Sequence, residues 1–393
     1  MKKLFLLLFL LLFLLLINFV YAQDLENVGI AKYAVLEVLD NRIPLRLEAN
    51  ENAKRITHLF KNTVLFADKQ NDNYYRVELK PDDYAWINKK FVEVQGIIPE
   101  KRFENINKIT FKDNKNNYFI KIETDMKSAY TFEENNNTNL NFTLYDNRYD
   151  PIETKVVNYI PRFTLSNKIE ENLKINFQNT TQLFGYNIDV VENGYILSIK
   201  KPPKINRKKP LKNIKIVVDP GHGGIEKGAC AFNLEEKNIN LQISKILAKE
   251  LRKKGAKVYL TRKKDKQINL YERVDFAKKK EADILLSIHQ NSLPNPKDVY
   301  KKHGVGTYYY HNQSKPLAQK IQNNLLKATD FKDDKVNYAS FALTRPTNQL
   351  SVLIECGYII YQQEAEKISD KNFQKIIASA IVKGCEEYLK EAF

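Results

Sequence analysis

The 393-residue chain is predicted to be a multidomain protein, in which two β-rich units precede an α/β unit of three layers. Its length corresponds to two or three domains at about 150 residues each. Short strand patterns recur before residue 200, and strand and helix patterns alternate after residue 211. Hydrophobic residues make up 43% and charged residues 28% of the chain, which are ordinary values for a protein with buried cores and exclude wholesale disorder.

The first 22 residues have the order of a secretory signal peptide. Met1-Lys2-Lys3 is a charged start, Leu4 to Ile17 carries no charge, and Val20-Tyr21-Ala22 offers a small-residue cleavage site. The alternative is an uncleaved membrane anchor, because the apolar stretch approaches the roughly 18–20 residues that span a bilayer. Both interpretations place the body of the protein outside the cytoplasmic membrane, in the periplasm or cell wall. No membrane span is expected after cleavage.

The charge balance predicts an anionic partner. Lys and Arg number 63 against 47 Asp and Glu, which gives a formal net charge of +16. In an exported protein this charge favours anions of the cell envelope, and no nucleic acid partner is expected. The alternative is a solvated basic surface with no particular ligand. The three cysteines are an odd number for an oxidising compartment, so at most one disulfide can form within the chain.

Residues 28–96 are predicted to form a small β-barrel, because polar turns separate short strand patterns at the spacing typical of all-β domains. The run from Ile43-Pro44-Leu45-Arg46 through Thr57 to Val64 and Tyr74 to Val77, ending in Ala85-Trp86-Ile87, resembles a bacterial SH3 domain. The resemblance implies that this unit binds wall peptides or glycan. Trp86 is interpreted as a core residue in preference to a platform for a ligand.

Residues 100–200 are predicted to be a second β-rich unit. Tyr118 to Ile122, Leu140 to Leu144 and Leu173 to Phe177 alternate with the period of half-buried strands, and Glu192-Asn193-Gly194 is a tight-turn signal. This stretch weakly resembles β-sandwich targeting domains that precede some wall amidases. Residues 201–211 are rich in Pro and Lys and are predicted to be an extended linker.

Residues 212–393 carry the α/β pattern. Buried-strand runs are Ile214 to Val218, Lys257 to Leu260, Ile284 to Ile288 and Val352 to Ile354. Between the first two runs, apolar residues recur at helical spacing from Ile239 to Leu251, and the C-terminal segment shows the same periodicity. Strands that alternate with helices predict helices on both faces of a sheet.

Two histidines follow buried strands in this unit. His222 lies in the glycine-rich run after Val217-Val218, and His289 follows the apolar run that ends at Ile288. Because open α/β sheets bind ligands at the carboxyl ends of their strands, both side chains are expected in one crevice. Glu236, just ahead of a helix predicted to begin near Asn238, can complete a His/Glu/His set with an open fourth position, as in catalytic zinc sites. For a histidine taken alone, the alternative is a satisfied core position.

Glu355 is predicted to end another buried strand, where an unpartnered charge would be costly. Beside a metal-bound water, this carboxylate could take a proton and pass it to a leaving amine. The alternative is a structural ion pair with Arg262, Arg273 or Arg345.

These motifs resemble the zinc-dependent N-acetylmuramoyl-L-alanine amidases of the Amidase_3 family. The residues that carry the likeness are Val217 to Gly224, Glu236 to Leu241, Thr261-Arg262, Leu270 to Arg273, Ala282 to Asn291 and Val352 to Tyr358. The resemblance implies Zn2+ bound by His222, Glu236 and His289, with Glu355 as the catalytic carboxylate. Asn291 is the candidate substrate-binding residue. Gln290 and Ser292 depart from the small residues usual there, as does Gln349-Leu350-Ser351 from the usual approach to the last strand.

The resemblance implies a peptidoglycan hydrolase that cleaves the amide between N-acetylmuramic acid and L-alanine of the stem peptide. One alternative is a zinc peptidase that acts within the stem peptide, and another is a catalytically inactive wall-binding protein. The short stretch from Ser292 to Gly306 suggests an open active site that needs no activator. A monomer is expected.

Overall fold

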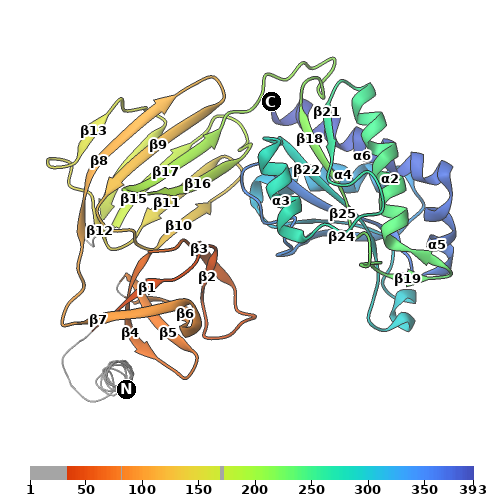
Figure 1. The fold of residues 1–393 in the computed structure, drawn as a ribbon. Helices are drawn as coiled ribbons and strands as arrows, with labels where there is room; N and C mark the ends of the chain where they lie inside the picture. Colours follow the sequence, from red (N-terminus) through yellow and green to blue (C-terminus); the bar gives the residue numbers. More distant parts are fainter. Residues whose placement is uncertain (1–32, 81, 169–171) are drawn as a thin grey trace, which may run out of the picture.

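The computed structural model describes residues 33–80, 82–168 and 172–393, and it arranges them around three large sheets (Figure 1). The predicted signal peptide lies outside the described residues. Within the described part of the chain, no helix is both long enough and apolar enough to cross a bilayer.

The first sheet has seven strands in the order β3-β2-β6-β5-β4-β1-β7, and its neighbouring strands are antiparallel. Alternate side chains, among them Leu36, Leu45 and Val77, fill the core of this unit. Its elements are β1 (Tyr33–Val38), β2 (Ile43–Arg46), β3 (Arg55–Leu59), β4 (Val64–Gln70), β5 (Tyr74–Lys80), β6 (Asp83–Asn88), the 3-10 helix η1 (Lys89–Phe91) and β7 (Val92–Ile98). The unit is strand-rich as predicted, and its SH3-like identity stays a prediction.

The second sheet has ten strands, with β10-β11-β15-β12-β8-β9-β17-β16 as its main path. β13 pairs with β8 and β14 pairs with β15, and β12 and β13 run parallel to β8. The strands are β8 (Glu104–Asp113), β9 (Asn117–Thr124), β10 (Tyr130–Glu134), β11 (Asn139–Leu144), β12 (Asn147–Arg148), β13 (Lys155–Val157), β14 (Phe163–Lys168), β15 (Asn172–Gln178), β16 (Tyr186–Val191) and β17 (Gly194–Lys200). The predicted tight turn joins β16 to β17.

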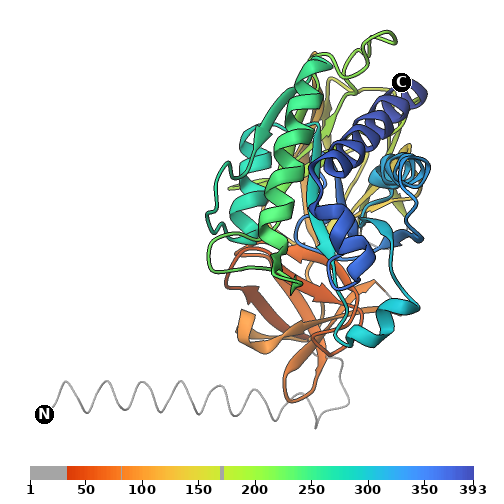
Figure 2. The ribbon, with the colours of Figure 1, turned by 90° about the vertical axis from the view of Figure 1, so that its right-hand side faces the viewer.

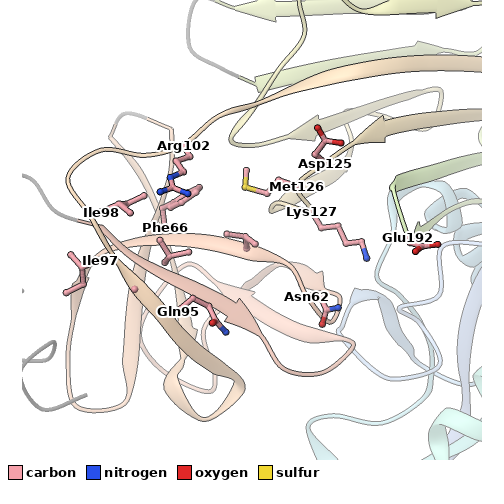
Figure 3. Close-up of a pocket in the computed structure, with 13 residues that line it drawn as sticks. Asn62, Phe66, Gln95, Ile97, Ile98, Arg102, Asp125, Met126, Lys127 and Glu192 are labelled. Atoms are coloured by element: carbon pink, nitrogen blue, oxygen red, sulfur yellow. The ribbon is translucent and has the colours of Figure 1, made fainter. Parts of the chain in front are cut away.

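A cavity of about 560 Å³ lies between these two units (Figure 3). Phe66 and Gln95 line it from the first sheet, and Asp125, Met126 and Lys127 line it from the loop that follows β9. The two units also share a core, because Ala129 and Tyr145 of the second pack into the apolar cluster of the first.

The third sheet has six strands in the order β21-β18-β22-β25-β23-β24. The first four in this order are parallel, β23 is antiparallel to β25, and β24 is parallel to β23. The strands are β18 (Lys215–Pro220), β21 (Lys257–Leu260), β22 (Ile284–Asn291), β23 (Val305–Tyr309), β24 (Asp333–Tyr338) and β25 (Leu350–Tyr358), with β19 (Cys230–Ala231) and β20 (Leu234–Glu235) as a separate small hairpin. The sheet is therefore mixed.

Helices cover both faces of this sheet, which confirms the predicted α/β fold. Val218 and Leu286 face the large core beneath α2 and α6, which lie side by side in Figure 2 and contact each other. Val217 and Leu285 face the opposite way, into a smaller core with Ala277 of α3. The helices are α2 (Glu236–Lys253), α3 (Leu270–Lys279), α4 (Lys315–Ala328), α5 (Gln362–Ser369) and α6 (Lys371–Ala392), with the 3-10 helices η2 (Pro296–Tyr300) and η3 (Asn312–Ser314).

Two predicted boundaries are wrong in detail. The helix expected to begin near Asn238 begins at Glu236, so this carboxylate belongs to the first turn of α2. The strand expected to end at Glu355 continues to Tyr358 as β25, because its backbone keeps pairing with β22 beyond that residue.

Candidate metal centre

His222 occupies a sharp turn directly after β18. Its backbone is in the left-handed region, with φ of 58°, which is uncommon for a residue with a side chain. Two buried arginines hold this turn by its carbonyl oxygens. Arg273 Nη2 donates to the carbonyl of His222 at 2.8 Å, and Arg262 Nη2 donates to the carbonyl of Gly221 at 2.9 Å. The turn is therefore fixed by the surrounding chain before any ligand binds.

Two glycines make room for the side chains of the site. A Cβ atom on Gly221 would lie 2.2–2.6 Å from ring atoms of His289. Gly228 has φ of +71°, and a Cβ there would lie 2.4 Å from Glu236 Oε2. Any side chain at these two positions would therefore collide with the residues of the site.

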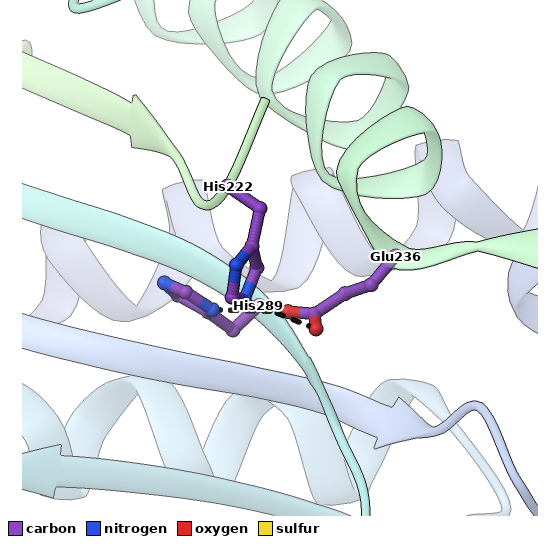
Figure 4. Close-up of side chains that lie close together, drawn as sticks. All are labelled: His222, Glu236 and His289. Atoms are coloured by element: carbon purple, nitrogen blue, oxygen red, sulfur yellow. Dashed lines mark hydrogen bonds and ion pairs between the residues drawn. The ribbon is translucent and has the colours of Figure 1, made fainter. Parts of the chain in front are cut away.

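The structure brings His222, Glu236 and His289 together (Figure 4). His289 comes from β22, between β18 and β25 in the sheet, and Glu236 is the first residue of α2. His222 Nε2 lies 3.1 Å from Glu236 Oε2, and His289 Nδ1 lies 2.9 Å from Glu236 Oε1. One possible ligand atom from each residue lies within 4.8 Å of the other two.

This donor set fits a zinc ion. Four ligands at about 2.05 Å in tetrahedral geometry are separated from one another by about 3.3 Å. His222 and His289 contact different oxygens of the Glu236 carboxylate, at 3.1 and 2.9 Å, and one donor atom from each of the three residues lies within 4.8 Å of the other two, so the group could hold one ion. Two imidazoles and one carboxylate are also ligands that zinc accepts, and they leave a fourth position open.

The carboxylate of Glu236 is held by the chain as well as by the histidines. The backbone amides of Ala229 and Gln290 donate to it at 2.9 and 3.1 Å, and Asn240 Nδ2 donates at 3.1 Å. Burial alone would raise its pKa, but the hydrogen bonds from His222 and His289 hold the pKa of Glu236 well below its usual value. The carboxylate of Glu236 is therefore ionised at neutral pH.

The pKa of His289 is shifted in the opposite direction to that of Glu236. Burial alone would lower its pKa, but the hydrogen bond and the charge of Glu236 raise the pKa of His289 above its usual value. Without a metal, the cluster is therefore held together by charge-assisted hydrogen bonds.

Glu355 lies beside this group in β25, in direct register with His289. Burial raises the pKa of Glu355 to about 8; His289 opposes this shift, while the nearby charges of Glu236 and Asp334 add to it. Its Oε2 atom has no hydrogen-bond partner among the described residues. A partly buried carboxyl with one unpartnered oxygen, beside a group that could hold a metal, has the properties of a general acid or base.

The alternative of a structural ion pair for Glu355 is not found among the described residues. Arg273 instead pairs with Asp219 at 2.9 Å, and both side chains are almost fully buried. Arg262 donates to backbone carbonyl groups, and so does Arg345. These arginines support the turn that carries His222 and the loop that precedes β25.

Sequence reasoning missed a second polar group, which lies at the carboxyl ends of β22 and β25. Asp334, in β24, accepts hydrogen bonds from Tyr358 Oη at 2.7 Å and from Asn291 Nδ2 at 3.3 Å. Asn291, the predicted substrate-binding residue, lies at the end of β22 and is only partly buried. The one signal in the sequence was the acidic pair Asp333-Asp334 at the start of a strand pattern, and by itself it has no specific meaning.

Comparison with known proteins identifies the family to which the third unit belongs. Residues 216–387 match the family model described as N-acetylmuramoyl-L-alanine amidase, Amidase_3. The uncharacterized protein YqiI of Bacillus subtilis is 32% identical over 196 residues, which cover 49% of this chain and 93% of YqiI. The chain belongs to the Amidase_3 family. The predicted metal ligands and Glu355 all lie inside the range that matches this amidase family.

Other relatives of this amidase chain carry named activities. N-acetylmuramoyl-L-alanine amidase LytC of Bacillus subtilis is 34% identical over 187 residues, covering 47% of this chain and 37% of LytC. Probable cell wall amidase LytH of Staphylococcus aureus is 32% identical over 184 residues, covering 46% of this chain and 60% of LytH. The chain thus spans less than two thirds of these two relatives. Among solved structures, an N-acetylmuramoyl-L-alanine amidase from Clostridium difficile 630 is 34% identical, with a TM-score of 0.44, over 46% of this chain and all of that one.

Proposed function

We propose that this protein hydrolyses peptidoglycan at the amide between N-acetylmuramic acid and L-alanine of the stem peptide, with zinc held by His222, Glu236 and His289. The observation that carries the proposal is the convergence of these three side chains, with possible ligand atoms within 4.8 Å of one another, beside the partly buried Glu355. Membership of the Amidase_3 family supports the choice of bond.

The metal, when bound, would supply a positive charge that polarises the scissile carbonyl and acidifies a water molecule. The role of the protein is to hold the three ligands and to exclude competing partners from Glu355. A cation held by these ligands would favour the ionised form of Glu355 and lower its pKa, so that this carboxyl would act as a base. Glu355 then accepts a proton from the attacking water and returns it to the nitrogen of L-alanine as the carbon–nitrogen bond breaks.

Digestion of purified peptidoglycan tests this proposal. Mass spectrometry should find free stem peptides that begin with L-alanine and glycan strands that keep the lactyl carboxylate. Dialysis against a chelator should abolish the reaction and added Zn2+ should restore it. Cuts within the stem peptide would identify a peptidase instead, and an intact substrate would identify an inactive wall-binding protein.

Measuring the zinc bound to each variant distinguishes a loss of metal binding from a loss of catalysis. His222→Ala should lower the bound zinc from about one ion per chain, because two ligands hold the ion far less tightly than three. Glu355→Gln should keep the zinc and lose the activity. Full activity of Glu355→Gln would refute the catalytic role of this residue.

We also propose that the chain is exported and acts as a monomer, and that the two β-rich units bind the wall. Supporting observations are the signal-like first 22 residues, the strand-rich first unit and the net charge of +16. The inactive Glu355→Gln chain should sediment with purified cell walls, and removal of residues 28–96 should reduce this retention. Because removal uncovers Ala129 and Tyr145, a thermal unfolding curve must show that the shortened chain folds.

A further inference from the structure

A lysine side chain, Lys302, lies at the carboxyl edge of the third sheet, beside the candidate metal centre. β23 is antiparallel to β25, so the residues just before β23 lie at the edge toward which the carboxyl end of β25 points. β24 is parallel to β23, so its first residues lie at the same edge. Lys302 and Asp334 therefore come to the edge that holds His289 and Glu355.

Contacts fix the position of this cation. Asp334 is 8% exposed, and its Oδ1 atom lies 3.5 Å from Lys302 Nζ. Its Oδ2 atom accepts hydrogen bonds from Tyr358, which is fully buried, and from Asn291. Because one carboxylate joins these three residues, the ammonium group of Lys302 is tied to the ends of β22 and β25.

Lys302 still has free donors. Its side chain is 53% exposed, and Asp334 is its one ion-pair partner in the described part of the chain. An ammonium group has three N–H donors, so at least one remains for an anion that approaches from solvent. Lys301, the neighbouring residue, is exposed and has no ion pair among the described residues.

The nearness of this cation to the metal ligands matches a feature of the substrate. Asn291 follows His289 by two residues, which is about 7 Å along a strand. Asp334, which joins Asn291 to Lys302, is close enough to Glu355 for its charge to raise the pKa of that carboxyl, so Lys302 lies near the candidate centre. An extended peptide advances about 3.3–3.6 Å per residue. The second and third residues beyond the scissile amide therefore lie about 7 and 10 Å away from it.

We propose that Lys302, positioned by Asp334, binds a free carboxylate on the second or third residue of the stem peptide and makes this carboxylate a determinant of specificity. The inference rests on the proposed function, because it takes the scissile amide to lie at the candidate metal centre. A carboxylate at either position has the charge and geometry that an exposed ammonium group recognises, and a carboxamide at the same position has no charge.

Three matched N-acetylmuramoyl tripeptides test this inference. One carries free carboxylates on its second and third residues, one has a carboxamide on the second residue, and one has a carboxamide on the third. The wild-type chain should show a KM about tenfold higher for one of the two amidated substrates, because a hydrogen bond to a charged group is lost. Which amidated substrate is affected identifies the residue that Lys302 contacts.

Variants assign the effect to the side chain. Lys302→Met should raise the KM for the free-acid substrate about tenfold, leave kcat unchanged and leave the KM for the affected amide unchanged. Lys302→Arg should restore most of the preference, and Lys301→Met is the matched control that should behave as wild type. The effect of Lys302→Met on the free-acid substrate should weaken as salt is added.

The possible outcomes distinguish a failure of the proposed function from a failure of the role proposed for Lys302. If the wild-type chain hydrolyses none of the substrates, the proposed function fails. If it hydrolyses all three with equal KM, the proposed function stands and the role of Lys302 is refuted. An equal rise in KM for all three substrates in Lys302→Met would show that Lys302 serves only to neutralise Asp334, which also overturns the inference.

Discussion

Replacement of Glu355 by Gln is expected to stabilise the metal-free protein while it abolishes activity. Burial raises the pKa of Glu355 to about 8 from its ordinary value of 4.5. Between these pH values the folded chain keeps a proton that the unfolded chain releases, so the free energy of unfolding falls as pH rises through this window. Glutamine has no such proton to lose, so the variant avoids this penalty.

The magnitude follows from the size of the shift. One pKa unit corresponds to about 1.4 kcal/mol. At a pH of about 7.5, three units above the ordinary pKa, this partly buried carboxyl lowers the free energy of unfolding by at most on the order of 4 kcal/mol. For a unit of this size, each kcal/mol moves the melting temperature by about 2–4 °C, so Glu355→Gln should melt higher than wild type by at most about 8–16 °C.

Thermal unfolding of the metal-free wild-type and variant chains, at pH values from about 4 to 8, measures this effect. The difference in melting temperature between Glu355→Gln and wild type should be near zero at the acid end of this range and should grow steadily toward the alkaline end. Glu364→Gln is the matched control, because Glu364 is a carboxyl that is buried and accepts hydrogen bonds from Tyr358 N at 2.7 Å and His303 Nδ1 at 2.6 Å. That variant should lose stability. A Glu355→Gln chain that is less stable than wild type at pH about 7.5 would refute the reasoning.

Three further outcomes are expected. Arg273→Met should destabilise the chain by about 3–5 kcal/mol in denaturant unfolding, because it leaves the charge of Asp219 buried without its ion-pair partner; a change below about 1 kcal/mol would contradict this. In the native chain a thiol reagent should modify Cys230, which is exposed, and spare Cys356 and Cys385, which are buried until the chain unfolds. Binding of Zn2+ near pH 7 should release protons, which calorimetry in buffers of different ionisation enthalpy can count. The Glu355→Gln chain should release fewer protons than wild type. Equal numbers would show that Glu355 does not lose a proton when the metal binds.

The convergence of His222, Glu236 and His289 could be predicted because it depends on local patterns. A buried-strand run followed by a histidine fixes where that side chain leaves a parallel sheet, and two such runs lead to one crevice. This reasoning placed His222 and His289 together without knowledge of the order of the strands. The start of α2 was missed by two residues because neither Glu235 nor Glu236 is a typical N-cap, and Glu235 makes no capping hydrogen bond.

The supporting contacts could not be predicted, because they join residues far apart in the chain. Lys302 and Asp334 meet only because β23 enters the sheet antiparallel to β25 and β24 follows it in parallel. The parallel pairing of β12 and β13 with β8 is non-local in the same way. A period of two residues assigns side chains to faces of a strand, but it does not say which strand lies alongside. The partners of Arg262 and Arg273 were missed for the same reason, because these backbone carbonyl groups and Asp219 lie far from the arginines in the sequence.

These long-range contacts explain how the site is fixed without a metal. The turn at His222 keeps a left-handed backbone because buried guanidinium groups bind its carbonyl oxygens, and Glu236 receives hydrogen bonds from two backbone amides in addition to the histidines. A metal would therefore replace the contacts between the histidines and the carboxylate and would leave the backbone in place. Glu355 differs from these residues, because it lies among groups already committed to other partners and only a cation or a proton can neutralise it. The same arrangement that makes Glu355 costly for stability therefore leaves it free for chemistry.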